Sequence, residues 1–157
     1  MATTEALERL YRERYVAFRN GLAPVVGSYE EARDVVQEAF ARALRSRGDF
    51  RGDGSLQAWV WKIALRIAVE RRRRDREDSL QVFDPQLIEA DRDHELSEAL
   101  RRLPPRKRLV VFLRYFADLS YAEIAEVAGI SEGTVAATLS QARAALLEQL
   151  SAKEVTR

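Results

Sequence analysis

One stretch near the C-terminus, residues 119–150, limits the possible folds of this chain more than any other. Its sequence is LSYAEIAEVAGISEGTVAATLSQARAALLEQL. Ser120 and Glu123 form a capping-box signature that begins a helix, Gly129 ends it, and Ser131 can cap a second helix. The apolar residues of that second helix recur at helical spacing: Val135, Leu139, Ala142, Leu146 and Leu150. This register predicts a helix-turn-helix, which places one helix in a DNA major groove, and an ordinary helical hairpin is the alternative.

Composition excludes several classes of protein. The 157 residues are 46% hydrophobic, which suits one compact domain or two small ones. Without cysteine and with one histidine, His94, the chain has no disulfide framework and none of the usual zinc sites. No apolar run reaches membrane-spanning length, and the N-terminus lacks the apolar core of a signal peptide. We expect a cytoplasmic protein without membrane insertion, metal or catalytic site.

The charge is unevenly distributed along the chain. Residues 77–95 carry seven acidic residues against one arginine, so the formal net charge of +1 corresponds to about +7 on the rest. Such separation suggests basic faces for a polyanion and an acidic connecting segment.

Helical periodicity dominates the chain, and no convincing alternating strand appears. The first amphipathic helix runs through Leu7 and Phe18, and we expect Gly21 and Pro24 to end it. Residues 28–44 carry a second capping box and a second apolar stripe, and a glycine-rich loop follows at 47–55. Ser55 can cap a third helix that continues into a run of arginines.

A second helical set begins near Asp91, breaks at Pro104 and Pro105, resumes to Phe116 and leads into the helix-turn-helix. The acidic segment between the two sets contains Pro85 and has little periodicity. The predicted architecture is therefore all-α, with two small helical domains, 1–76 and 93–157, joined by an acidic flexible linker, 77–92.

The third predicted helix combines positive charge with aromatic rings. Its basic residues are Lys62, Arg66, Arg71, Arg72, Arg73 and Arg74, and its aromatic residues are Trp59 and Trp61. This combination can hold a single-stranded nucleic acid, with unstacked bases lying on the rings. The alternatives are a solvated helix end and buried tryptophans, and we expect at least one of the two to be buried.

The second predicted helix carries DVVQEAF, in which Asp34 and Glu38 are four residues apart. No histidine or nucleophile accompanies them, which argues against catalysis. They form either a solvated face or a surface that docks on a basic partner helix. LPPRKR, residues 103–108, either begins a helix with proline in its first turn or touches DNA phosphate or a protein. The chain also lacks a Walker loop, so no nucleotide cofactor is implied.

These segments, in this order, resemble the bacterial RNA polymerase sigma factors of the extracytoplasmic-function type. DVVQEAF resembles the family's core-polymerase-binding helix, and FRGDGSLQAWVWKIA resembles its loop and helix for the start-proximal promoter element. LPPRKRLVVFLRYFADLSYAEIAEVAGISEGTV resembles the beginning and the helix-turn-helix of its second domain. The resemblance covers nearly the whole chain.

The resemblance implies three functional surfaces. The surface for core polymerase would contain Asp34, Val35, Gln37, Glu38 and Phe40. The start-proximal promoter surface, which captures flipped bases, would contain Arg51, Gly52, Ser55, Trp59, Lys62 and Arg66, with Arg71, Arg72, Arg73 and Arg74 on phosphates. The upstream surface, in the helix-turn-helix, would contain Ser131, Glu132, Thr134, Ala136, Thr138, Ser140, Gln141 and Arg143.

The chain departs from the family pattern in two places. Where relatives carry a lysine and further arginines, it has Ala136, Ala137, Thr138 and Gln141, which predicts weaker or more shape-based reading of the upstream element. Arg66 stands where relatives often have asparagine, so the base preference of the start-proximal element could differ.

The function indicated is a non-catalytic initiation factor that binds core RNA polymerase, directs it to promoter DNA and assists melting. The resemblance also implies an anti-sigma partner and no small-molecule substrate or cofactor. Two other functions remain open: a helix-turn-helix regulator that binds duplex DNA without polymerase, and a sigma-derived protein-interaction module.

Overall fold

The computed structural model describes residues 1–75, 94–115 and 117–155. The chain divides into two compact units, Met1–Leu87 and Ile88–Arg157. The predicted linker, residues 77–92, lies outside the described residues. Within the described ranges all regular structure is helical, as predicted for an all-α chain.

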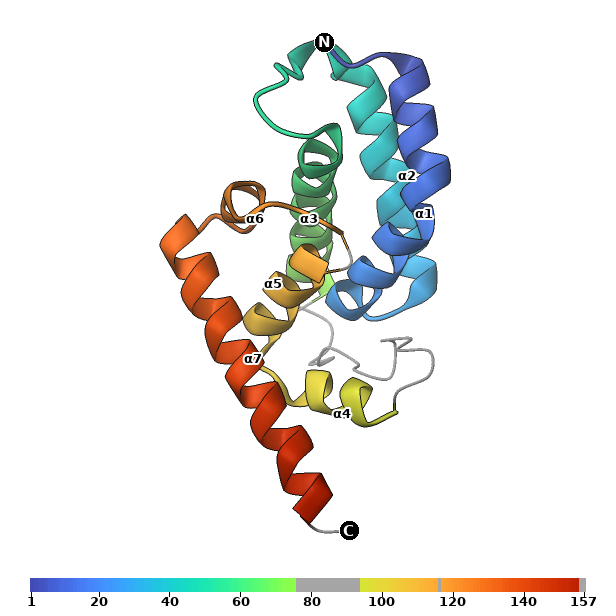
Figure 1. Ribbon diagram of the computed structural model, residues 1–157. Coiled ribbons are helices and arrows are strands. Elements are labelled where there is room, and N and C mark those ends of the chain that lie inside the picture. Colours follow the sequence, from blue (N-terminus) through green and yellow to red (C-terminus); the bar gives the residue numbers. More distant parts are fainter. Residues whose placement is uncertain (76–93, 116, 156–157) are drawn as a thin grey trace. The chain divides into compact units, whose positions relative to one another are not determined.

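The described part of the first unit, residues 1–75, contains the helices α1 (Thr4–Val26), α2 (Tyr29–Arg45) and α3 (Leu56–Asp75), with a 3-10 turn at Arg47–Asp49 (Figure 1). Two of the predicted caps are present. The Ser28 hydroxyl accepts from the N–H of Glu31 at 3.1 Å, and the Ser55 hydroxyl accepts from the N–H of Ala58 at 3.0 Å. Both satisfy N–H groups that a helix start would otherwise leave unpaired.

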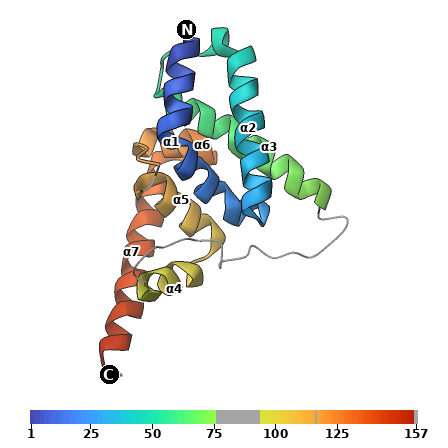
Figure 2. The same cartoon turned by 90° about the vertical axis from the view of Figure 1, so that its right-hand side faces the viewer.

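The predicted end of the first helix was wrong. α1 continues through Gly21 and Pro24 and stops only at Gly27, which has a left-handed φ of 97°. Proline removes one backbone hydrogen bond, but Leu22 and Ala23 beside it are fully buried, and their burial outweighs that loss. Figure 2 shows α1 changing direction in its second half, the usual effect of proline within a helix.

A chain of aromatic rings holds the first unit together. Phe18 of α1 stacks on Trp61 of α3, with ring centroids 4.3 Å apart and planes at 14°, and both side chains are fully buried. Phe18 also meets Phe40 of α2 edge-on at 5.4 Å, and Phe40 meets Tyr11 of α1 at 5.0 Å. One buried tryptophan was predicted, and Trp61 confirms it.

The second unit contains α4 (His94–Arg102), α5 (Pro105–Tyr115), α6 (Tyr121–Ala128) and α7 (Glu132–Val155). α4, α5 and α6 all pack against α7. Pro105 is the first residue of α5, as the helix-start interpretation of residues 103–108 predicted.

The helix-turn-helix forms as predicted from α6 and α7. The capping box of Ser120 and Glu123 has both of its hydrogen bonds, and Gly129 ends α6 with a left-handed φ of 69°. Ser131 caps α7 by accepting from the N–H of Thr134 at 3.1 Å. Across the described residues, no helix is both long and apolar enough to span a membrane.

The aromatic stack predicts that Trp61→Ala lowers the free energy of unfolding by about 3–5 kcal/mol, because it removes a large buried ring and leaves a cavity. Urea denaturation followed by circular dichroism measures this. Val69→Ala, at a 53% exposed position of the same helix, should stay within about 0.5 kcal/mol of the parent. A similar small change for both variants would contradict the role of the stack.

Candidate functional surfaces

The outward face of α2 carries only part of the set predicted to bind core polymerase. Asp34 and Gln37 are exposed and Glu38 is half-buried, whereas Val35 and Phe40 lie in the core at 0% and 6% exposure. The prediction treated a continuous run of residues as one surface, but a helix turns Val35 and Phe40 to its inner side. Those two residues therefore pack α2 against the core and do not form part of its solvent-exposed face.

Glu38 is the centre of an ion-pair network that joins α2 to α3. Its carboxylate accepts from Arg42, one turn further along α2, and from Arg71 of α3 at 3.0 Å. A second nitrogen of Arg71 lies 3.3 Å from the carboxylate of Glu31. One guanidinium therefore bridges two carboxylates that stand two turns apart on α2.

This network changes the expected role of Arg71. The sequence predicted that Arg71 contacts phosphates, but the structure commits its guanidinium to Glu31 and Glu38. The hydrogen bond from Arg71, assisted by Arg42, holds the pKa of Glu38 below its ordinary value although partial burial opposes this. Glu38 therefore stays ionised and paired near neutral pH.

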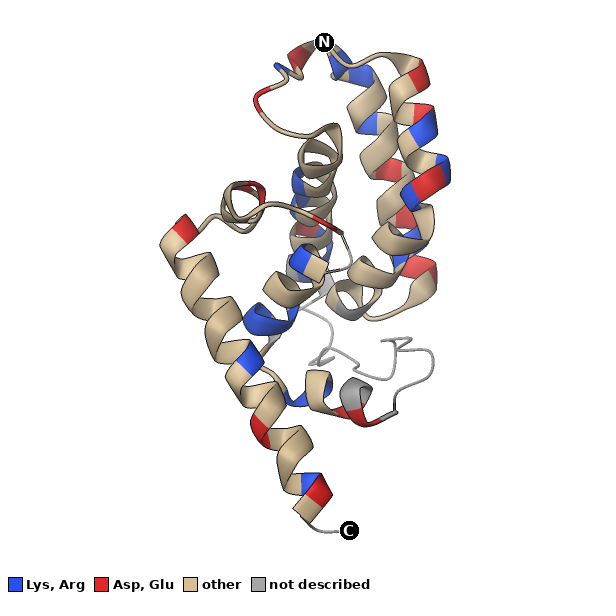
Figure 3. Cartoon of the chain, in the orientation of Figure 1, with Lys and Arg blue, Asp and Glu red and all other residues tan. Residues whose placement is uncertain are grey.

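The outer surface of α3 retains the other basic residues. Arg66 and Arg74 are exposed, and Lys62 and Arg72 are half-buried. The side chain of Arg73 lies outside the described part of the chain. Figure 3 shows mainly basic residues along α3, whereas acidic and basic residues are intermixed along α1 and α2.

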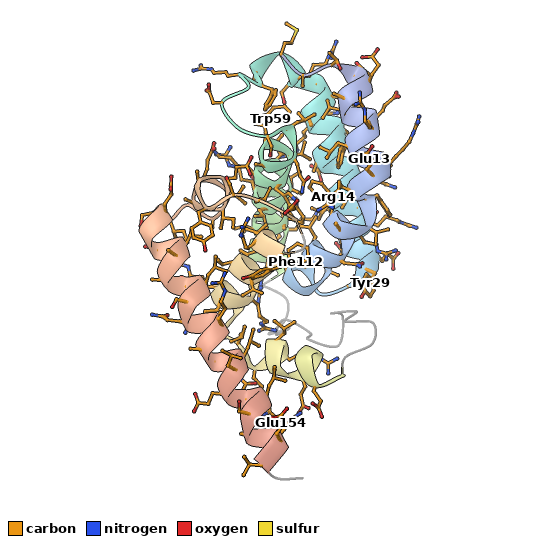
Figure 4. All side chains as sticks on the ribbon, in the orientation of Figure 1. Glu13, Arg14, Tyr29, Trp59, Phe112 and Glu154 are labelled. Carbon is orange, nitrogen blue, oxygen red and sulfur yellow. The ribbon has the colours of Figure 1, made fainter. Side chains whose placement is uncertain are left out.

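An aromatic pair lies next to the loop that precedes α3. Trp59, labelled in Figure 4, is half-buried. Its ring lies 5.4 Å from that of Phe50 at an angle of 50°. Arg51, Gly52 and Ser55 of the loop are exposed, and Gly52 has a φ of 80°, which only glycine adopts easily. The sequence reasoning missed Phe50, although an aromatic residue directly before a glycine-rich loop was a usable signal.

Most of the residues predicted for the upstream surface lie on the open side of α7. The exposed members are Ser131, Glu132, Thr134, Ala136, Ser140, Gln141 and Arg143. Thr138 is the exception: at 8% exposure it lies on the inner side with Val135, Leu139 and Ala142, so its assignment to the surface was wrong. Figure 3 shows little charge along the first half of α7, in agreement with its sequence.

Arg143 has a partner that the sequence reasoning did not identify. Its Nε and Nη2 atoms lie 2.8 Å and 2.6 Å from the hydroxyl of Tyr115, at the end of α5. The two residues are 28 positions apart in the sequence, so no local pattern reveals this contact. Within the described ranges, no group of three or more histidine, cysteine, aspartate or glutamate residues could hold a metal ion.

Comparison with known proteins identifies both units. The Sigma-70 region 2 family matches residues 7–77, and the Sigma-70 region 4 family matches residues 93–146. RNA polymerase sigma factor SigV of Bacillus subtilis is 32% identical over 139 residues, covering 83% of this chain and 82% of SigV. The ECF RNA polymerase sigma-E factor of Escherichia coli K12 is 30% identical over 155 residues, covering 83% and 81%.

Two solved structures share the fold. One is the sigma factor RpoE of Bartonella quintana in complex with the anti-sigma factor NepR, with a TM-score of 0.70 and 22% identity over 92% of this chain and 98% of that one. The other is CnrH in complex with the cytosolic domain of CnrY, with a TM-score of 0.68 and 24% identity over 96% and 91%. At these identities the likeness concerns the fold alone.

The lowered pKa of Glu38 predicts a pH-dependent contribution to stability. A carboxylate whose pKa is depressed by folding stabilises fully above its unfolded value, about 4.3, and loses this effect as the pH falls through the folded value. Glu38→Gln should therefore cost about 0.5–1 kcal/mol of unfolding free energy near neutral pH. That difference from the parent should shrink as the pH falls through the unfolded value and disappear once the pH lies below the folded one.

Urea midpoints measured from neutral to acidic pH check this, with Asp34→Asn, at an exposed position one turn earlier, as the matched control. A Glu38→Gln curve that runs parallel to the parent at every pH would exclude a charged role for Glu38.

Proposed function

Since this chain belongs to the extracytoplasmic-function sigma factors, we propose that its two units divide the binding of core RNA polymerase and the reading of a two-part promoter. As a family member it is a transcription initiation factor that directs RNA polymerase to promoters. One observation supports the assignment of the separate surfaces. In the first unit, an acidic face of α2 lies beside α3, which carries basic residues and an accessible aromatic ring.

We assign the docking of core polymerase to the exposed side of α2. Asp34 and Gln37 are the groups available to a basic partner helix, and Glu38 is already paired with Arg42 and Arg71. A partner that approaches Glu38 would have to displace one of these arginines, whereas Asp34 and Gln37 need only lose water. Asp34 and Gln37 would therefore make the first contacts, and complementary charge would favour the encounter.

The capture of bases belongs to the loop before α3 and to the exposed residues of that helix. A base that leaves the duplex costs a few kcal/mol in lost stacking, and a new aromatic partner recovers part of this. Trp59, supported by Phe50, offers such a ring, while Lys62, Arg66, Arg72 and Arg74 supply positive charge for the strand. Promoter melting would follow from this exchange.

The second unit would place α7 in the major groove of the upstream element. Arg143 would meet the DNA backbone, while Thr134, Ser140 and Gln141 supply uncharged hydrogen-bonding groups. With few positive charges, binding by α7 should depend less on salt than that of a lysine-rich and arginine-rich helix.

By analogy with RpoE and CnrH, each solved with its own partner, an anti-sigma protein would regulate this chain by covering its polymerase-binding faces. We also propose that it acts in the cytoplasm and catalyses no reaction itself, because RNA synthesis belongs to the polymerase.

Run-off transcription with purified core polymerase on genomic DNA fragments tests the function as a whole. Promoter-dependent transcripts support it. Sequence-specific duplex binding without polymerase and without any promoter-dependent transcript would instead indicate an independent regulator, and core binding without any transcript would indicate an interaction module.

The docking assignment predicts that the double variant Asp34→Lys and Gln37→Lys weakens association with core polymerase by about tenfold, because like charges then face the basic partner. Titration of core polymerase into fluorescently labelled chain measures this. Circular dichroism should be unchanged, since both positions are exposed. Glu13→Lys, a charge reversal on the exposed side of α1, serves as the control, and an equal effect of the control would refute the assignment.

The capture assignment predicts that Trp59→Ala reduces promoter opening by about 5- to 100-fold, the equivalent of one lost base stack. Permanganate reactivity of unpaired thymines near the start site measures opening, and affinity for core polymerase should change little. Trp59→Phe, which keeps a ring, should retain most of the activity. Parental reactivity in Trp59→Ala would rule out this ring as a platform for bases.

A further inference from the structure

Tyr115 makes an unusual polar contact with Arg143 in the second unit. Its side chain is 55% exposed, yet its hydroxyl accepts two hydrogen bonds from Arg143, at 2.8 Å and 2.6 Å. The guanidinium also lies over the tyrosine ring, 5.8 Å from its centroid. An exposed arginine is normally free to change rotamer, so these contacts hold Arg143 in one orientation before any partner binds.

The pair has donors left for a further partner. A guanidinium carries five N–H groups. Tyr115 uses one on Nε and one on Nη2, and Tyr121 also interacts with Arg143, so part of the set remains for another acceptor. Because the tyrosine oxygen accepts from Arg143, its own O–H is still able to donate. Several donors around one fixed positive charge suit a phosphate oxygen, since hydrogen bonds between charged groups are the strong ones.

The position of the pair indicates which anion it would meet. Arg143 lies on the open side of α7, within one turn of the exposed Ser140 and Gln141. The other basic residue of α7, Lys153, lies 2.7 Å from the carboxylate of Glu98 in α4 and so has an anionic partner within the unit. Arg143 is instead held by an uncharged phenol, which leaves its positive charge available to DNA.

We propose that Tyr115 is a positioning residue for Arg143 and that their two side chains together bind one backbone phosphate of the upstream promoter duplex. The inference rests on the proposed placement of α7 in the major groove and adds a residue from α5 to that surface. The pair would also partly compensate for the basic residues that relatives carry in this helix and this chain lacks. A preorganised arginine binds with more affinity than a mobile one would.

Equilibrium binding of the full chain to a 20-base-pair duplex of mixed sequence tests the proposal, because a phosphate contact does not depend on sequence. Fluorescence anisotropy at several salt concentrations yields both the affinity and its salt dependence. Tyr115→Phe keeps the ring under the guanidinium and removes only the hydroxyl. It should weaken binding by about fivefold, whereas Arg143→Gln should weaken it further and reduce the salt slope by about one.

The double variant provides the decisive comparison. If the two side chains act on one phosphate, Tyr115→Phe should have little further effect in the Arg143→Gln background. Tyr11→Phe, which removes a phenol hydroxyl from the first unit, should match the parent in both affinity and salt slope.

The remaining outcomes separate failure of this inference from failure of the role of α7. Parental binding by Tyr115→Phe, together with a loss in Arg143→Gln, would overturn the inference and leave the role of α7 intact. If both variants bind like the parent, Arg143 does not lie in the interface. This result would overturn the inference and the proposed role of α7. A loss in Tyr115→Phe that persists in the Arg143→Gln background would show that the hydroxyl acts independently of Arg143, and would also overturn the inference.

Discussion

The stack of Phe18 on Trp61 determines how the first unit presents its surfaces. It fixes the rotation of α3 against α1, because a large ring in close contact allows only one orientation of the helix that carries it. With Trp61 turned inward, Arg66 and Arg74 face outward, and Trp59 is left half-exposed beside the loop. A buried apolar contact thereby decides which charges can reach a nucleic acid.

The same unit connects its two proposed interfaces through one arginine. Arg71 belongs by sequence to the basic run of α3, but its charge is satisfied by Glu31 and Glu38 of α2. Ion pairs that are partly open to solvent contribute modestly to stability, so the consequence concerns geometry more than energy. The acidic residues of α2 keep a fixed arrangement, and the basic surface of α3 loses one positive charge.

In the second unit, the helix-turn-helix combines an ordinary frame with an unusual outer surface. The capping box, the left-handed Gly129 and the Ser131 cap are the features that a helix-turn-helix needs locally. The outer side of α7 instead offers alanine, hydroxyl and amide groups with a single arginine before its final turns. Affinity for DNA must then depend on how well each remaining contact is placed, and on the polymerase that carries the chain to its promoter.

The sequence by itself determined the all-α class, the helix starts at Ser28, Ser55 and Ser131, and the helix-turn-helix, because caps, glycine turns and helical periodicity act within a few residues. Resemblance to a family identified the function from short motifs in a fixed order.

Only the tertiary structure decided which contacts form between segments that are far apart in the sequence. The burial of Leu22 carries α1 past Pro24, and a helix turns Phe40 and Thr138 inward although both lie in motifs that suggested contact. The pairing of Tyr115 with Arg143 is another contact that only the tertiary structure decided, because the two residues are 28 positions apart in the sequence. Such contacts depend on how whole helices pack, and helix packing is a property of many side chains at once, which no short stretch of sequence encodes.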